Sequence, residues 1–321
     1  MRYWIANPFI LPKSMNFHDA YLQTTLAFRG KDRQSFLHRL CTQDLRLLQD
    51  NPVLETFFTD VKGKSLAHGW VFNQTDAILV TVHGQHQERL LTHFDRYLIR
   101  EDVAIADESG QWIWYYGNRE LFPRLEIEFL DLPKNSLQWG HIPSNLAAEF
   151  PSALAWKESH ARYGWLGVAS TDAPRLVSFL QERGGIISTE NDHHNARIRD
   201  DWPQFGLDFD ESHLPQEIDR DAKAISFTKG CYLGQETIAR LDALGQVQKK
   251  LFRLQCKGQQ NVAAGARVMV DSTEAGWITS SAIDSQENQT QMMAFIKRAF
   301  HSRSTRFTVE GIETTYASPT C

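Results

Sequence analysis

The residues with the clearest chemical potential form a short loop around Cys231. Gly230 and Gly234 bracket this cysteine, Lys229 stands two residues before it, and a helical pattern begins at Gln235. A nearby lysine and a following helix N-terminus both favour the thiolate over the thiol. A thiolate in a glycine loop suits a nucleophile, a redox sensor or a metal ligand. The alternative is a small cysteine packed beneath a helix, and the residues alone leave both interpretations open.

The segment after this loop is predicted to be a helix that ends at Gly245. Its apolar residues recur at helical spacing, and glycine is favoured just past a helix end. Glu236 and Arg240 stand four residues apart, so we expect them to pair on one face of the helix. Glu236 also complements the positive end of the helix dipole.

The remaining cysteines lie apart from the loop. Cys41 falls at a helix-core position, Cys256 alternates within a strand-like run, and Cys321 is the last residue of the sequence. No two cysteines form a C-x-x-C pair, which argues against a zinc knuckle or a disulfide framework. An iron–sulfur cluster needs about four ligands, usually thiolates. The chain therefore suits a cluster that is shared or transient better than one of its own.

Two histidine groups carry a weaker metal signal. Asp192, His193 and His194 are consecutive but fall in a segment that we expect to be a polar loop. His83 and His86 lie in a segment that is predicted to begin a helix. We take neither group as a metal site. Phosphate-binding glycine loops and a nucleophile elbow are also absent from the sequence.

The bulk properties are those of a globular chain. The sequence has 321 residues, which is enough for one large or two to three smaller cores. The net charge of −5 argues against a broad nucleic-acid-binding surface. No apolar run is long enough for a membrane span, and the N-terminus lacks signal-peptide features. Cytoplasmic residence is therefore the expectation.

Strand and helix patterns alternate up to residue 245, and the secondary-structure pattern then changes. Helices are predicted over residues 32–41, 85–98 and 174–183, and strands over 21–28, 56–60, 66–72, 77–82, 112–116, 125–130 and 165–169. Residues 1–20 are expected to be irregular. After residue 245, short strand-like runs alternate with turn residues, as in a small antiparallel barrel or sandwich. We predict an α+β fold with two domains, 1–245 and 246–321.

The cysteine loop resembles the signature of the YgfZ-type proteins. The matching residues are Lys229, Gly230, Cys231, Tyr232, Gly234, Gln235 and Glu236, with Arg240 four residues further on. Other segments are similar to the same family in the same order, at residues 30–37, 59–66, 197–217, 276–281 and 293–298. Only residues 100–160 match poorly.

This resemblance implies the fold of the related glycine-cleavage T-protein, an aminomethyltransferase. That fold has an α+β body of two ferredoxin-like lobes and a small C-terminal antiparallel β-barrel, arranged as a ring with a central hole. Tetrahydrofolate binds in the hole. Residues 1–245 would form the folate-binding body, and residues 246–321 would form the barrel.

The resemblance also implies which residues contact the folate. Glu217 matches the glutamate that holds the pterin, and a carboxylate can accept two N–H donors from such a ring. Tyr21 and Trp202 would stack on the pterin, while Lys249 and Lys250 would face the glutamate tail. The simpler interpretations are a solvent-exposed turn glutamate, two core aromatics and two solvated lysines.

One departure from the T-proteins concerns the strand after the turn at residues 62–64. T-proteins carry there an acidic pair that aminomethyl transfer needs, and this sequence has Ala67 and His68 instead. Alanine cannot orient or protonate an amine, and histidine differs in charge and reach. The resemblance is therefore to the YgfZ branch, which is associated with iron–sulfur cluster assembly or repair, particularly in radical-SAM enzymes that thiolate tRNA.

We accordingly expect a folate-binding accessory protein that supports iron–sulfur maturation without turnover of its own. Cys231 would be its functional thiol and a shared or transient cluster ligand. Its partners would be assembly proteins or radical-SAM client enzymes, without direct contact with nucleic acid or membrane. Two alternatives stay open. One is a folate-dependent one-carbon transferase or demethylase, with Asp60 supplying the missing carboxylate, and the other is a scaffold that has lost folate.

Overall fold

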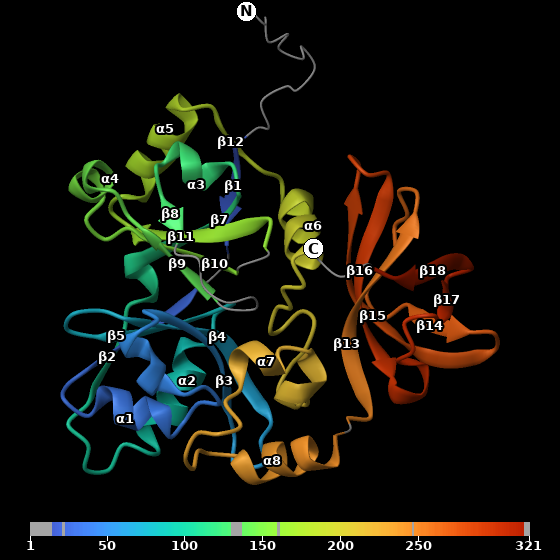
Figure 1. Cartoon of the computed structure of the whole chain (residues 1–321), viewed down its shortest axis with the longest axis horizontal. Coiled ribbons are helices and arrows are strands. Elements are labelled where there is room, and N and C mark those ends of the chain that lie inside the picture. The colour runs from blue at the N-terminus through green and yellow to red at the C-terminus, as the bar shows by residue number, and fades with distance from the viewer. Residues whose placement is uncertain (1–14, 21–22, 130–136, 159–160, 246, 318–321) are drawn as a thin grey trace, which may run out of the picture.

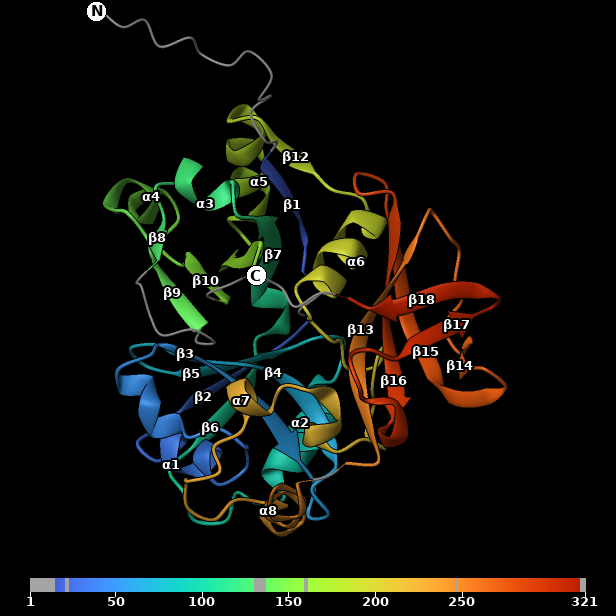
Figure 2. The same cartoon turned by 45° about the vertical axis from the view of Figure 1, so that its right-hand side comes forward.

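Three sheets organise the chain, and helix α6 (Glu190–Arg199) lies between the upper lobe and the barrel (Figure 1). The computed structural model describes residues 15–20, 23–129, 137–158, 161–245 and 247–317. Within these ranges, no helix is long and apolar enough to cross a membrane. Figures 1 and 2 show one α/β lobe above the other and the barrel beside both.

The first lobe is built on a five-stranded antiparallel sheet in the order β3-β4-β5-β2-β6. Its strands are β2 (Thr24–Arg29), β3 (Val53–Thr59), β4 (Ser65–Asn73), β5 (Ile78–Val82) and β6 (Ala104–Asp107). The helices of this lobe are α1 (Arg33–His38), η1 (Leu45–Gln49) and α2 (Gln87–Asp95).

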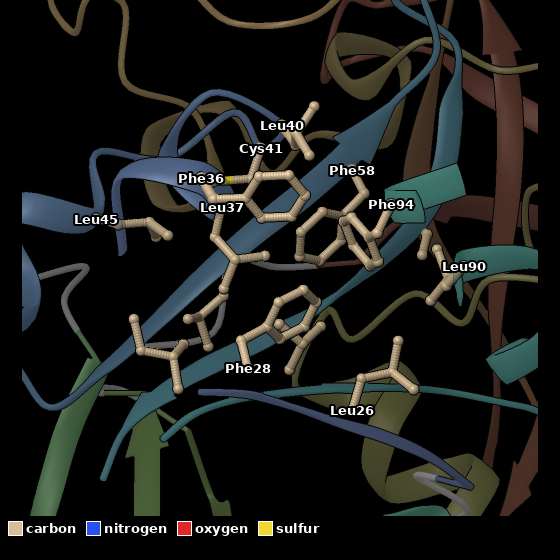
Figure 3. Close-up of a cluster of buried hydrophobic side chains, with 14 of the residues drawn as sticks. Leu26, Phe28, Phe36, Leu37, Leu40, Cys41, Leu45, Phe58, Leu90 and Phe94 are labelled. Carbon is tan, nitrogen blue, oxygen red and sulfur yellow. The ribbon is translucent and has the colours of Figure 1, made fainter. Parts of the chain in front are cut away.

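An apolar core fills the space between this sheet and its helices (Figure 3). Phe94 of α2 meets Phe28 and Phe58 edge to face, with ring centroids 5.0 and 5.3 Å apart. Cys41 is buried in the same core. The apolar spacing predicted this helix core correctly, because it depends on neighbours that are local in sequence.

The second lobe has a seven-stranded sheet in the order β12-β1-β7-β11-β10-β9-β8. Its strands are β1 (Met15–Asp19), β7 (Trp112–Asn118), β8 (Glu128–Phe129), β9 (Leu137–His141), β10 (Leu154–Glu158), β11 (Tyr163–Ala169) and β12 (Gly185–Ile187). Its short helices are η2 (Ser109–Gln111), α3 (Leu121–Arg124), α4 (Ser144–Glu149) and α5 (Ala173–Glu182).

Two predictions in this lobe were wrong. Residues 15–19 were expected to be irregular, but they form β1, which pairs with β7 and β12 from distant parts of the chain. Residues 125–130 were expected to form one strand, but among the described residues 125–129 only the two-residue β8 is a strand. The N–H groups of Leu125 and Ile127 donate to carbonyls of α3, so bonds to the preceding turn take the place of strand pairing there. The structure of β1 depends on distant partners, which local patterns do not reveal.

The central segment holds α6 (Glu190–Arg199), η3 (Pro215–Ile218), α7 (Asp221–Ala224) and α8 (Gln235–Leu244). Residues 192–194, expected to be a polar loop, are helical. Thr189 and Asp192 form a capping box that satisfies backbone donors at the start of α6, although the helix has little apolar periodicity.

The C-terminal strands close into a six-stranded antiparallel barrel, which confirms the predicted fold class. They are β13 (Lys249–Lys257), β14 (Arg267–Val270), β15 (Thr273–Asp284), β16 (Gln289–Lys297), β17 (Arg306–Val309) and β18 (Ile312–Tyr316), with η4 (Arg298–Phe300) after β16. The barrel packs against α6, where buried Arg197 donates to Asp208 at 2.7 Å and Thr279 of β15 donates to the same carboxylate.

A buried ion network joins the two lobes. Arg220 donates to both oxygens of Glu55 on β3, at 2.7 and 2.5 Å, and also to Glu158 on β10. Lys223 of α7 bonds the other oxygen of Glu158, and Nε2 of His68 lies 2.7 Å from Glu55. Burial alone would raise the pKa of Glu55, but Arg220 and His68 hold it well below its usual range.

We predict that Arg220→Met lowers the free energy of unfolding by about 3–5 kcal/mol, because two buried carboxylates lose their partner. Denaturant unfolding at neutral pH measures this. The control is Arg267→Met, which removes a pairing with Glu274 between largely exposed side chains and should cost about 0–1 kcal/mol. Equal stability of Arg220→Met and the parent protein would contradict the structural role of the network.

Candidate functional site

Cys231 is exposed in the loop that leads into α8. The helix begins after Gly234, whose φ of 80° is in the left-handed region. A Cβ on Gly234 would stand 2.5 Å from the carbonyl oxygen of Asp60 and 2.7 Å from the Cα of Gly63. Glycine is therefore required both by conformation and by this close approach to the β3–β4 turn.

Hydrogen bonds hold the loop on both sides of the thiol. The Lys229 ammonium donates to the carbonyls of His38, Cys41 and Gln43 at 2.5, 2.9 and 2.8 Å. On the other side, Leu233 N–H donates to the Arg39 carbonyl at 2.9 Å. The Leu233 carbonyl accepts from the Thr59 hydroxyl at 2.7 Å. The loop is thus fixed to the first lobe.

These bonds change the role that the sequence indicated for Lys229. The lysine was expected to favour the thiolate of Cys231 by its charge. All three of its N–H donors are matched by backbone carbonyls of residues 38–43, and burial lowers its pKa. Lys229 therefore acts on the site by anchoring the loop.

The other motif residues divide into buried and exposed groups. Tyr232 is buried in the core beneath the loop, with the Lys229 ammonium 5.0 Å from its ring. Gln235 opens α8 and is half-buried, while Gly230, Glu236 and Arg240 are exposed. The expected pairing of Glu236 with Arg240 does not occur, since no ion pair joins these two described residues. Only Ile238 of α8 is buried.

Cys231 differs from the other described cysteines in accessibility. Cys41 and Cys256 are buried, and burial raises the pKa of both thiols. Cys321 lies outside the described residues. Among the residues that the structure describes, no cluster of three or more His, Cys, Asp or Glu side chains is arranged to hold a metal.

At the strand positions where T-proteins carry acidic residues, the side chains of this chain are packed inside the protein. Ala67 and His68 are both buried. His68 pairs with Glu55, and its ring stacks on Phe57 with centroids 4.4 Å apart. Burial lowers the pKa of His68. Asp60 accepts the Lys62 and Lys64 N–H groups at 2.8 Å each, so this carboxylate caps the β3–β4 turn.

The residues that the resemblance assigned to folate already have partners within the chain. Glu217 is 8% exposed and accepts the Leu214 N–H at 3.0 Å, so the solvated-turn alternative is wrong. Trp202 is buried and stacks on Trp70 with centroids 4.2 Å apart.

The two lysines are also engaged. The Lys249 ammonium lies 4.8 Å from the centre of the Phe295 ring, and Lys250 pairs with Asp219 at 2.5 Å. Glu217 and the two lysines belong to neighbouring elements, because η3 packs on β13 and Lys250 pairs with Asp219 at the end of η3. Trp202 instead belongs to the aromatic core between the lobes. Tyr21 lies outside the described residues.

One residue at the centre of the molecule carries a signal that the sequence analysis overlooked. Glu55 interrupts the apolar run of β3, yet it is buried, and a buried charge in a strand requires a partner. Its partner Arg220 comes from a distant segment that carries no recognisable motif, and so do Glu158 and Lys223, which complete the network.

Replacing Lys229 with methionine tests the anchoring of the loop. The variant leaves three carbonyls without their donor. We therefore expect its free energy of unfolding to be about 1–3 kcal/mol lower than that of the parent protein. Hydrogen exchange of residues 227–234 should also become faster than in the parent. Lys62→Met, at an exposed position of the neighbouring turn, is the matched control. Unchanged exchange in the Lys229 variant would contradict the anchoring role.

Comparison with known proteins gives relatives of three kinds. The chain is 34% identical over 264 residues to "Iron-sulfur cluster assembly factor IBA57, mitochondrial" of Mus musculus, covering 76% of this chain and 68% of the relative. It is 25% identical over 245 residues to "tRNA-modifying protein YgfZ" of Aliivibrio fischeri, covering 74% and 70%. It is 23% identical over 260 residues to the aminomethyltransferase of Rubrobacter xylanophilus, covering 79% and 68%. No family model matches the chain.

A solved structure shows the same architecture. The glycine cleavage system aminomethyltransferase T from Bartonella henselae superposes with a TM-score of 0.76 and covers 95% of this chain and 85% of its own. At 12% identity this likeness concerns the fold alone. With the 34% identity to the IBA57 protein, it establishes that the chain belongs to the YgfZ-like family, which is related to the glycine-cleavage T-protein.

Proposed function

We propose that this chain is a folate-binding accessory protein for iron–sulfur cluster assembly or repair, with Cys231 as its functional thiol. The observation that carries the proposal is the anchored loop, which presents Cys231 to solvent while Cys41 and Cys256 are buried. The IBA57 relative, an iron–sulfur cluster assembly factor, and the YgfZ relative, a tRNA-modifying protein, support the same process.

The loop geometry suits a thiol that is shared with another molecule. A cluster takes about four ligands, and this surface offers one. Because the backbone on both sides of Cys231 is held, the thiol meets a partner with little loss of conformational freedom. Iron–sulfur assembly proteins and radical-SAM enzymes that modify tRNA are the partners we propose, in the cytoplasm. The cluster or its sulfur is cargo in this scheme.

The folate part of the proposal rests on family membership and on the chemistry available between the lobes. Tetrahydrofolate carries a pterin ring whose N–H edge needs carboxylate acceptors. Glu55 and Glu158 are already bonded to Arg220, His68 and Lys223, whereas Glu217 uses only Oε2, for the Leu214 N–H. The Glu217 carboxylate is therefore the group that would bind and orient a pterin ring.

No observation in the site favours the one-carbon transferase alternative. A transferase needs a carboxylate or another base close to the reacting nitrogen. At the corresponding strand Ala67 has no polar group, His68 is bound to Glu55, and Asp60 is used by its own turn. These contacts support an accessory role without turnover.

The proposal predicts that Cys231→Ser fails to restore thiolated tRNA in a bacterial strain that lacks its own YgfZ-type protein, whereas the parent chain restores it. Serine keeps the size of the side chain but not the soft sulfur ligand. Thr228→Ala, an exposed neighbour in the same loop, is the control and should behave like the parent. The readout is the thiolated fraction of tRNA, measured by mass spectrometry of its nucleosides.

Full restoration by Cys231→Ser would remove the thiol from the proposed function. Anaerobic incubation with iron, sulfide and a small thiol gives a second readout, in which visible absorption should appear with the parent and be lost with Cys231→Ser. Equal absorption from both proteins would likewise count against a ligand role for Cys231.

A further inference from the structure

Histidines from three separate segments of the chain lie together beside α6. His193 and His194 belong to this helix, and the His193 ring stacks on His18 of β1 with centroids 4.7 Å apart. His83, in the loop between β5 and α2, is close enough for the charges of His194 and Arg197 to act on it. These four histidines, His18, His83, His193 and His194, are called the histidine cluster below. The cluster joins α6 to both lobes.

The hydrogen bonds of the cluster require neutral rings. The Gln204 side-chain amide donates to Nε2 of His193 at 3.4 Å, and the Arg197 guanidinium donates to Nδ1 of His194 at 3.0 Å. Amide and guanidinium nitrogens can only donate, so both ring nitrogens must accept. A protonated imidazole has no acceptor nitrogen. A proton on either ring would therefore place a donor against a donor.

The surroundings of the cluster oppose the same proton. His18 and His193 are 8% and 4% exposed, and His194 is half-buried. Burial lowers the pKa of His193 to about 2, with further contributions from His18 and Arg197. Burial and Arg197 also lower the pKa of His83 to about 3. Each of these neighbours is a cation when it is charged.

The acidic and phenolic groups near the cluster have other roles or lie at its edge. Asp208 accepts from buried Arg197 at 2.7 Å and so neutralises that guanidinium. Glu190 is 3.7 Å from Nε2 of His194, but its side chain is exposed. Tyr116 of β7 meets the His193 ring edge to face, and its hydroxyl donates to Asp200. Beyond His83, the β5–α2 loop carries His86, which is a further potential cation.

Helix α6 lies between the second lobe and the barrel (Figure 1). It packs on β15 and β16, and Arg199 at its end donates to Asp284 of the barrel at 2.6 Å. Asp200, the residue after the helix, accepts from the Tyr116 hydroxyl of the second lobe at 2.9 Å. A change in the position of α6 would therefore change how the barrel is joined to the second lobe.

We propose that the histidine cluster is a pH-sensitive contact that holds α6 against the two lobes. Above about pH 6.5 the neutral rings accept from Gln204 and Arg197, and α6 stays in place. At lower pH the rings bind protons, lose these bonds and repel Arg197. Helix α6 then separates from β1 and from the β5–α2 loop.

The direction of the effect follows from which state binds more protons. In the folded protein the pKa values of His83, His193 and His194 are lowered, whereas in the opened state they return to about 6.5. The contact is therefore complete above about pH 6.5 and is lost as the pH falls. Each ring that must stay neutral favours the opened state about tenfold more at about pH 5.5 than at about pH 7.5.

Hydrogen exchange of the full chain tests this contact. Protection factors of residues 193–199, corrected for the intrinsic pH dependence of exchange, are compared at about pH 7.5 and about pH 5.5. In the parent we expect the protection of α6 to fall by about tenfold or more at the lower pH. Helix α5, which contains no histidine, should keep its protection within about threefold.

Two substitutions remove the titrating rings. His193→Gln keeps an acceptor for Gln204 but binds no proton in this range, so its loss of α6 protection should be about tenfold smaller than that of the parent. His194→Asn does the same at the half-buried ring and replaces His193→Gln if that variant does not fold. His141→Gln, at an exposed histidine of β9 outside the cluster, is the control and should lose as much protection as the parent.

Three outcomes would overturn the proposal. One is equal protection of α6 at the two pH values, and another is a folded His193 or His194 variant that loses as much protection as the parent. The third is an equal loss in α5 and α6, which would indicate acid unfolding of the whole chain. None of these measurements involves Cys231 or folate, so the proposed function is tested separately.

Discussion

The pairing of Arg220 with two buried carboxylates is the constraint on which the arrangement of the lobes depends. Glu55 belongs to the first sheet and Glu158 to the second, so one guanidinium must satisfy groups from both. An unpaired charge at such a position costs several kcal/mol. A shift of either strand by one residue would move its glutamate away from Arg220. The lobes can therefore pack together only when Glu55 and Glu158 both face Arg220. The neighbouring tryptophans pack around this alignment, and Trp202 lies 5.3 Å from the Arg220 guanidinium.

The same network is connected to the cysteine loop by a short path through the first lobe. Lys223 bonds Glu158 by its side chain, and its carbonyl accepts from the Gln43 amide at 2.7 Å. The Gln43 carbonyl in turn accepts from Lys229, two residues before Cys231. The cysteine loop and Glu158 are thus joined by one continuous set of hydrogen bonds.

Local patterns predicted the parts of the structure that depend on local neighbours. The strand runs after residue 245 indicated the barrel, and Gly234 and Gly245 marked the ends of α8. The exposure of Cys231 was one of two interpretations that the sequence left open. The insertion of β1 into the second sheet and the pairing of Glu55 with Arg220 were not predictable, because both depend on residues more than ninety positions away along the chain. Lys229 was recognised as important, but its three carbonyl partners, and hence its role, came only from the tertiary structure.

The enclosed side chains at the centre of the molecule contrast with an exposed thiol at its edge, and this contrast indicates how the fold is used. At the strand where T-proteins place their acidic pair, His68 is bound to Glu55 and enclosed by Phe57, Trp202 and Phe209. Side chains so enclosed stabilise the protein but cannot exchange protons with a substrate. The thiol that we propose as the functional group, Cys231, is instead exposed on a loop whose backbone is hydrogen-bonded to the first lobe on either side. An exposed thiol that is held in this way, and that belongs to no metal-ligand cluster among the described residues, is suited to completing a site on another molecule.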